Sequence, residues 1–191
     1  MSWFSWANLL SISRLGAAIP CAYAVIEGVW VIAAVLFIYA VLSDFIDGYV
    51  ARNLGEVSAL GGLLDHTSDA CFVTLTLAAF AYLGLVPAPL PLLIAAAFLQ
   101  YVLDSRALVG STLRASVLGR GNGICYFILA GLAILAQLTQ IPWPSWWLMV
   151  LGWLLVATTV TSMLDRAWAL LNSRQRNGLD STTENTESTE G

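Results

Sequence analysis

The chain has 191 residues, of which 59% are hydrophobic and 10% are charged. Soluble domains carry about 25% charged residues, so this composition argues against a water-soluble domain and favours an integral membrane protein. The formal net charge is −4, from eight arginines and no lysine against twelve acids. That balance is not the basic one of a nucleic-acid-binding protein.

The N-terminal residues do not have the pattern of a secretory signal, because Arg14 is the first charged residue and no early basic region precedes it. Aromatic side chains cluster at Trp3, Phe4 and Trp6. Such clusters are typical of the boundary between lipid and water. We therefore expect a short N-terminal interfacial segment before the first membrane span.

Six apolar segments follow, each about long enough to cross the hydrocarbon core. A backbone in lipid must satisfy its own hydrogen bonds, so each span is expected to be helical. The predicted fold class is an all-α integral membrane protein with six transmembrane helices. The predicted spans are Leu9–Ile26, Val29–Arg52, Gly61–Leu83, Leu92–Leu113, Asn122–Gln140 and Ser145–Leu171.

The arginines give an independent test of this layout. In a six-span topology all eight fall on the same side of the membrane, whereas the opposite turns, near Gly28, 87–91 and 142–144, contain none. The positive-inside rule makes the arginine-rich side cytoplasmic, together with both termini. We expect a multi-pass protein of the bacterial inner membrane.

The sequence divides into a membrane domain, residues 1–171, and a polar tail, residues 172–191. The tail reads NSRQRNGLDSTTENTESTEG and has little apolar surface to bury. It is expected to be disordered in the cytoplasm.

Four carboxylates lie near the predicted cytoplasmic edge of the second and third spans. Asp44 and Asp47 are three residues apart, and Asp65 and Asp69 are four apart, so each pair shares one helix face. A charge at the centre of a span costs about 3 kcal/mol on insertion scales, so the group needs compensation. A hard divalent cation with oxygen ligands would supply it. A structural ion cluster and the cation path of a cation-coupled transporter are alternatives at this point.

The spacing in this region is specific. Residues 44–69 fit the pattern D-x-x-D-G-x-x-A-R-x8-G-x3-D-x3-D, with Gly48, Ala51, Arg52 and Gly61 at the remaining fixed positions. The chain therefore resembles the CDP-alcohol phosphatidyltransferases, which join a CDP-activated lipid to an alcohol. The resemblance implies a six-helix membrane enzyme, usually a homodimer, with a polar site that faces the cytoplasm.

The resemblance also implies residue roles. Asp44, Asp47, Asp65 and Asp69 would bind one or two Mg²⁺ or Mn²⁺ ions, and Asp69 would take the proton of the acceptor hydroxyl as the catalytic base. Asp44 would also belong to the nucleotide site. There Gly48 and Ala51 would make room for the cytidine nucleotide of a CDP-diacylglycerol-like donor, and Arg52 would meet its diphosphate.

The alcohol acceptor is less closely defined by the sequence. Arg106, Arg114 and Arg120 suit either an anchoring role at lipid head groups or a pocket for a phosphorylated acceptor. They resemble residues of the phosphatidylglycerophosphate synthases, which makes glycerol 3-phosphate the preferred acceptor. Inositol phosphate, serine, an amino alcohol and phosphatidylglycerol are alternatives. His66, which lies between two of the acids, is expected to be a packing residue rather than an acceptor contact.

Overall fold

The computed structural model describes residues 6–54, 59–104, 117–141, 144 and 146–187, and its side chains are described except at 6–7, 47–54, 59–60, 104, 117–118 and 170–187. Six helices and no strand occur in these parts, which confirms the predicted all-α class. The helices are α1 (Trp6–Ile26), α2 (Trp30–Leu54), α3 (Ala59–Tyr82), α4 (Pro89–Asp104), α5 (Val117–Thr139) and α6 (Trp147–Glu187).

The helix ends follow from glycine and proline. Gly28 and Gly84 have φ values of 70° and 72°, which favour glycine, and they end α1 and α3. In each turn the glycine N–H and the next N–H bond back to carbonyls three and five residues earlier, as in a Schellman motif. Pro89 begins α4, where the missing N–H of proline costs no helical hydrogen bond.

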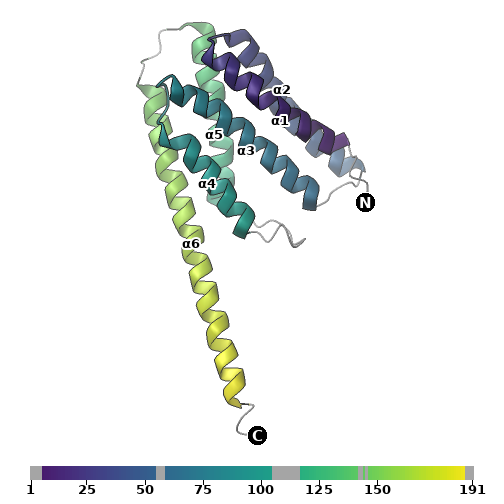
Figure 1. Ribbon diagram of the computed structural model, residues 1–191, viewed down its shortest axis with the longest axis vertical. Helices are drawn as coiled ribbons and strands as arrows, with labels where there is room; N and C mark the ends of the chain where they lie inside the picture. Colours follow the sequence, from purple (N-terminus) through teal and green to yellow (C-terminus); the bar gives the residue numbers. More distant parts are fainter. Residues whose placement is uncertain (1–5, 55–58, 105–116, 142–143, 145, 188–191) are drawn as a thin grey trace.

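The helices form an antiparallel bundle (Figure 1). Helix α1 packs against α2 and α3, α3 against α4, and α5 against both α2 and α6. The end of α2 and the beginning of α3 therefore lie at the same end of the bundle as the N-terminal half of α1 (Figure 1). This end carries the predicted carboxylates.

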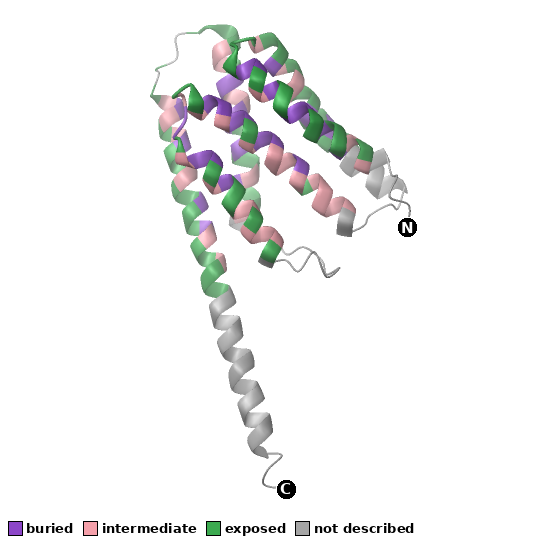
Figure 2. Cartoon of the chain, viewed as in Figure 1, coloured by how far each residue is buried: buried purple, intermediate pink, exposed green. Residues whose placement is uncertain are grey.

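Many described positions of the bundle are exposed, as the green segments of Figure 2 show, and large hydrophobic side chains are among them. Large side chains such as Ile19, Phe45 and Leu92 are 70–75% exposed. Three stretches of described helix are long and apolar enough to cross a membrane: Asn8–Ile26, Gly119–Thr139 and Trp147–Ala169. Two shorter apolar stretches are Trp30–Ile46 and Pro89–Leu103. A lipid environment accounts for exposed apolar surface of this extent, so the protein is a membrane protein.

Helix α6 differs from the sequence-based expectation. It continues as one helix to Glu187, through most of the tail that was expected to be disordered (Figure 1). The segment 172–187 contains no proline and one glycine, Gly178, so nothing in it forces the helix to end. A helix that has already begun adds residues without a new nucleation cost.

The close approach of α6 to the turn between α3 and α4 gives a testable packing prediction. A Cβ at Gly152 would lie 2.2 Å from Cδ of Pro87. We expect Gly152→Ala to lower the thermal midpoint in detergent by roughly 2–12 °C, because overpacking costs about 1–3 kcal/mol. Gly16→Ala is the control, since its Cβ would meet no described atom within 4 Å. Equal midpoints for the two variants would contradict this packing.

Candidate active site

The site is centred on Arg14, whose side chain is completely buried. Its Nη1 atom donates to Oδ1 of Asp44 at 3.4 Å and to Oδ1 of Asp65 at 3.1 Å. The same nitrogen makes a close ion pair with Oδ1 of Asp69. Three carboxylates from α2 and α3 therefore converge on one nitrogen from α1.

Two serines complete the surroundings of the guanidinium. Arg14 Nε donates to Oγ of Ser43 at 3.1 Å, and Nη1 lies 3.4 Å from Oγ of Ser68. Both serine hydroxyls also donate to carbonyls three residues earlier in their own helices, at 2.9 and 2.8 Å. The serines can therefore accept from the guanidinium while their own protons are used within the helix, which fixes the position of the charge.

The charges at this point do not balance. When all three are ionised, the carboxylates of Asp44, Asp65 and Asp69 carry three negative charges, against the one positive charge of Arg14. The side chains of Asp44, Asp65 and Asp69 are 50%, 30% and 23% exposed, so water reaches them only in part. A partly buried excess of two negative charges needs a partner, and one divalent cation matches it in charge.

The described geometry can hold such an ion. Ligand atoms of Asp65, His66 and Asp69 lie within 4.8 Å of one another, and all three residues belong to one stretch of α3. Oxygen-rich sites of this kind suit hard cations such as Mg²⁺, and an imidazole adds a ligand that Mn²⁺ accepts. The imidazole of His66, which the sequence analysis expected to be a packing residue, therefore lies close to the carboxylates of Asp65 and Asp69. Its ring also packs edge-on against Tyr101, with centroids 5.9 Å apart.

The other predicted site residues divide into two groups. The side chains of Asp47, Gly48, Ala51 and Arg52 lie outside the described set, although α2 extends through all four positions. Arg106 and Arg114 lie outside the described residues altogether. Their predicted roles stay predictions.

The carboxylates open onto a large cavity of about 930 Å³ between the helices. Asp44, His66 and Asp69 line its acidic side. Polar residues of α4, α5 and α6 line the facing side, and apolar residues of α2 and α5 extend it along the bundle. The facing polar lining comprises Gln100, Tyr101, Arg120, Asn122, Thr159, Ser162 and Arg166, and the apolar part includes Phe37, Val41, Ile124, Ile128 and Leu132.

Two cationic side chains therefore line the same cavity as the carboxylates. Arg120, at the beginning of α5, was predicted as an acceptor contact, and the structure places it in the lining. Arg166 of α6 was not predicted, and its guanidinium lies over the Tyr101 ring, 5.3 Å from the centroid. That cation–π contact positions a positive charge at the cavity wall. In the sequence, Arg166 could have been noticed as an arginine that lies about one helical turn inside an apolar span.

A buried acceptor is also present in the cavity wall. Gln100 Nε2 donates to the carbonyl of Met163 at 3.1 Å, whereas its buried Oε1 has no hydrogen-bond partner among the described residues. A buried, unsatisfied oxygen costs free energy unless a ligand or water donates to it. Besides its carboxylates, the cavity thus offers two arginines and the amide oxygen of Gln100 for a polar ligand.

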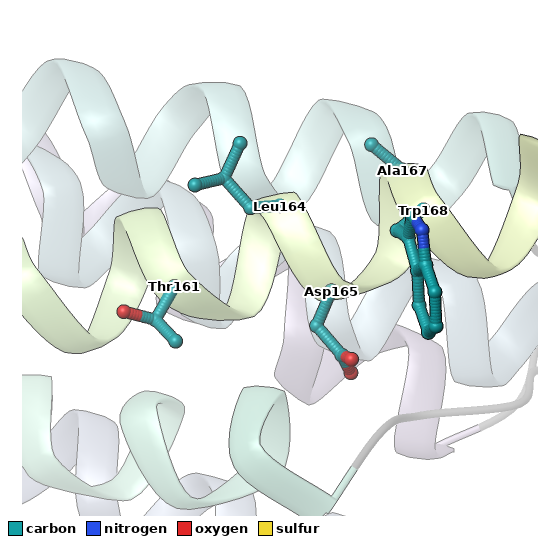
Figure 3. A pocket seen from close by; sticks show the side chains of 5 residues that line it. All are labelled: Thr161, Leu164, Asp165, Ala167 and Trp168. Atoms are coloured by element: carbon teal, nitrogen blue, oxygen red, sulfur yellow. The ribbon is translucent and has the colours of Figure 1, made fainter.

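A second hollow, outside the main cavity, lies on α6 and is shown in Figure 3. Thr161, Asp165 and Trp168 belong to its lining, together with two apolar residues. It is open and largely apolar, and it brings no further acid or base beside Asp165. The main cavity is therefore the candidate active site.

The family model for CDP-alcohol phosphatidyltransferases matches residues 4–161, most of the chain. A six-helix membrane bundle with an acidic cluster at one end fits that assignment, and this chain belongs to the CDP-alcohol phosphatidyltransferase family. Family membership gives no support to the transporter alternative. No solved structure matches the chain significantly.

Named relatives fall into two groups. The chain is 38% identical over 88 residues to a cardiolipin synthase (CMP-forming) of Homo sapiens, covering 46% of this chain and 29% of that protein. It is 35% identical over 75 residues to a CDP-diacylglycerol–glycerol-3-phosphate 3-phosphatidyltransferase of Aquifex aeolicus, covering 39% and 42%. An enzyme of the same name from Bacillus subtilis is 30% identical over 108 residues, covering 56% and 51%. The matches thus span about half or less of these relatives.

Proposed function

We propose that this protein transfers a phosphatidyl group from CDP-diacylglycerol to an alcohol and releases CMP. The observation that carries the proposal is the convergence of Asp44, Asp65 and Asp69 on one nitrogen, beside a cavity that Asp44 and Asp69 line and that continues into apolar surface. The acidic end suits a cation-bound diphosphate, and the apolar part suits acyl chains. Both parts are needed for a nucleotide-activated lipid.

One or two Mg²⁺ or Mn²⁺ ions would be held by Asp44, Asp65 and Asp69, together with Asp47 of the same signature. When bound, the cation supplies charge neutralisation for the diphosphate and its CMP leaving group. Gly48, Ala51 and Arg52 occupy the next turns of α2. In this proposal they lie beside the cytidine diphosphate, where Arg52 adds a positive charge.

Asp69 is the proposed catalytic base. It lines the cavity and has the least exposed carboxylate of the three. As the acceptor oxygen bonds to the phosphorus that bears the diacylglycerol, its proton passes to Asp69, and the bond from that phosphorus to the CMP oxygen breaks. The chain's own contribution is positioning and proton acceptance, without a covalent intermediate.

The facing wall favours an anionic acceptor with a free hydroxyl. Arg120 and Arg166 would pair with a phosphate, and Gln100 Oε1 would accept from a hydroxyl. Glycerol 3-phosphate has both groups and is our first candidate, in line with the names of the Aquifex and Bacillus relatives.

Phosphatidylglycerol is the second candidate. It also combines a phosphate with free hydroxyls, and its product with a phosphatidyl group is cardiolipin, the lipid in the name of the human relative. The apolar lining of the cavity, which includes Ile124, Ile128 and Leu132, would suit its acyl chains.

The deciding experiment is an acceptor panel. Full-length protein in detergent or nanodiscs receives CDP-diacylglycerol and Mg²⁺ or Mn²⁺, with glycerol 3-phosphate, phosphatidylglycerol, inositol phosphate, serine or an amino alcohol. CMP release and the lipid product are both measured. The proposal fails if no acceptor causes CMP release.

We also propose a homodimer in the inner membrane of a bacterium, with the termini and the acidic end on the cytoplasmic side. The proposed orientation is supported by the placement of all eight arginines toward one side of the predicted topology. A reporter fused to the C-terminus should be active only in the cytoplasm. Mass measurement in nanodiscs should give two copies of the chain.

The acceptor contact leads to a second prediction. Arg120→Ala should raise KM for glycerol 3-phosphate roughly 10–100-fold, because a charge-assisted hydrogen bond contributes about 1.5–3 kcal/mol. KM for CDP-diacylglycerol should change little. Arg174→Ala, in the C-terminal extension of α6, is the matched arginine control.

Glycerol serves as the uncharged comparison in the same assay. The Arg120→Ala variant should lose far less activity with glycerol than with glycerol 3-phosphate. An equal loss of activity with both acceptors would mean that Arg120 binds lipid head groups and does not contact the acceptor.

A further inference from the structure

Arg14 has a role that the family signature does not define. It lies outside residues 44–69, on a different helix, yet its buried guanidinium contacts carboxylates at both ends of that signature. The three contacted oxygens are the Oδ1 atoms of Asp44, Asp65 and Asp69, and all three meet the same nitrogen. A cation that bound all three carboxylates would have to compete with this nitrogen for them.

We propose that Arg14 is an internal counter-cation that holds these three carboxylates together when no metal is bound and lowers their affinity for a divalent cation. The inference rests on the proposed metal binding. It adds Arg14 to the metal site and states that Arg14 lowers the affinity of the site for the metal. Arg14 is thus a positioning residue, which acts through Asp44, Asp65 and Asp69.

The stabilising half of this role follows from charge. Without Arg14, three carboxylates would face one another in a partly buried site with no described cation among them. Like charges at such distances repel strongly when water is largely excluded. The metal-free protein should therefore depend on Arg14 for the packing of α1 against α2 and α3.

The weakening half follows from the same contacts. A positive charge within about 4 Å of each carboxylate disfavours a second cation there, and each Oδ1 is already engaged. Ser43 and Ser68 also accept hydrogen bonds from the guanidinium, so it does not move away without losing these bonds as well. The metal must share the carboxylates with Arg14 or displace it, and either route lowers its affinity.

The test compares Arg14→Gln and Arg14→Lys with the wild-type full chain in nanodiscs. Glutamine removes the charge and keeps hydrogen-bonding capacity, whereas lysine keeps the charge. Glu27→Gln is the control, because it removes one charge at the exposed far end of the α1 region. Two quantities are measured without turnover: the thermal midpoint in EDTA and in saturating Mn²⁺, and the dissociation constant for Mn²⁺ by electron paramagnetic resonance of the free ion.

For Arg14→Gln we expect a midpoint in EDTA lowered by roughly 6–20 °C, a deficit at least halved by saturating Mn²⁺, and a Mn²⁺ dissociation constant at least about tenfold lower. If the variant folds only when Mn²⁺ is present, that supports the same role. Arg14→Lys keeps the charge but loses the bond to Ser43, so it should lie between Arg14→Gln and wild type in both quantities, whereas Glu27→Gln should stay near wild type.

Unchanged or weaker Mn²⁺ binding by Arg14→Gln would overturn the proposal, as would an equal loss of midpoint with and without Mn²⁺. Failure of both Arg14 variants to fold with Mn²⁺ present would make Arg14 purely structural and overturn it too. If the wild type binds no Mn²⁺, the inference also falls. CMP release by the wild type, measured separately, then decides whether the proposed function falls with it.

Discussion

Asp69→Asn should abolish CMP release, with at least a 1,000-fold loss in kcat while the protein remains folded. A positioned base contributes about 10²–10⁴-fold, and Asp69 would also be a metal ligand. The amide cannot accept the proton of the acceptor hydroxyl at neutral pH. It is nearly isosteric with the carboxylate, so its oxygen can still accept a hydrogen bond from Arg14.

The two roles of Asp69 can be separated by titrating Mn²⁺ in the assay. If Asp69 were only a ligand, saturating Mn²⁺ would recover most of the rate. A rate of CMP release that stays low at saturating Mn²⁺ would indicate that Asp69 acts as the base. Asp165→Asn is the matched control, since Asp165 lies in the separate hollow on α6 and should leave kcat within about twofold (Figure 3). CMP release by Asp69→Asn within tenfold of wild type would exclude Asp69 as the base.

The helices were predictable because their ends depend on local chemistry. Gly28 and Gly84 supply the positive φ that ends α1 and α3, and Pro89 sets the beginning of α4. The predicted starts and ends of the first three spans lie within three residues of the observed ones. The C-terminal extension of α6 was less predictable, because polar composition predicts little burial but does not forbid a helix that continues from a stable segment.

The carboxylates were predictable from spacing, whereas Arg14 was not assigned to the site. The predicted topology placed it at the cytoplasmic edge of the first span, and its contact with Asp69 joins positions 55 residues apart. A local signal did exist. Ser11, Arg14, Ala18 and Cys21 repeat at helical spacing and are all buried, so Arg14 lies on the inward stripe of α1. A charged residue on such a stripe needs an opposite charge on a neighbouring helix.

The facing wall of the cavity shows the limit of sequence reasoning. Gln100, Arg120 and Arg166 belong to three different helices, and their proximity depends on how α4, α5 and α6 pack. No periodic pattern within one helix contains that information. The sequence supplied Arg120 through its position after an apolar span, but the placement of Arg166 over Tyr101 required the tertiary structure.

Removal of divalent cations should have an effect as large as loss of the base. Dialysis of the protein against EDTA should reduce CMP release at least 1,000-fold, and Mg²⁺ or Mn²⁺ should restore it. Among the described side chains, the ionised forms of Asp44, Asp65 and Asp69 would exceed Arg14 by two negative charges. In the proposed function, a CDP diphosphate would bring further negative charge to the same place, so we expect binding of the donor to depend on a compensating cation.

A potassium salt at the same ionic strength is the control that distinguishes a bound divalent cation from general screening of charge. Salt screens exposed charges, but these carboxylates are 23–50% exposed and contact one buried guanidinium, so screening alone should not restore the rate. The rate of CMP release should instead reach a plateau at a low Mn²⁺ concentration. The Mn²⁺ concentration that gives half of this rate should change when the carboxylates are substituted. Asp65→Asn should require more Mn²⁺ for half-maximal activity, because it removes one anionic ligand from the cluster. Full activity in EDTA, or equal restoration by potassium, would mean that Arg14 and the arginines of the facing wall neutralise the diphosphate without a metal.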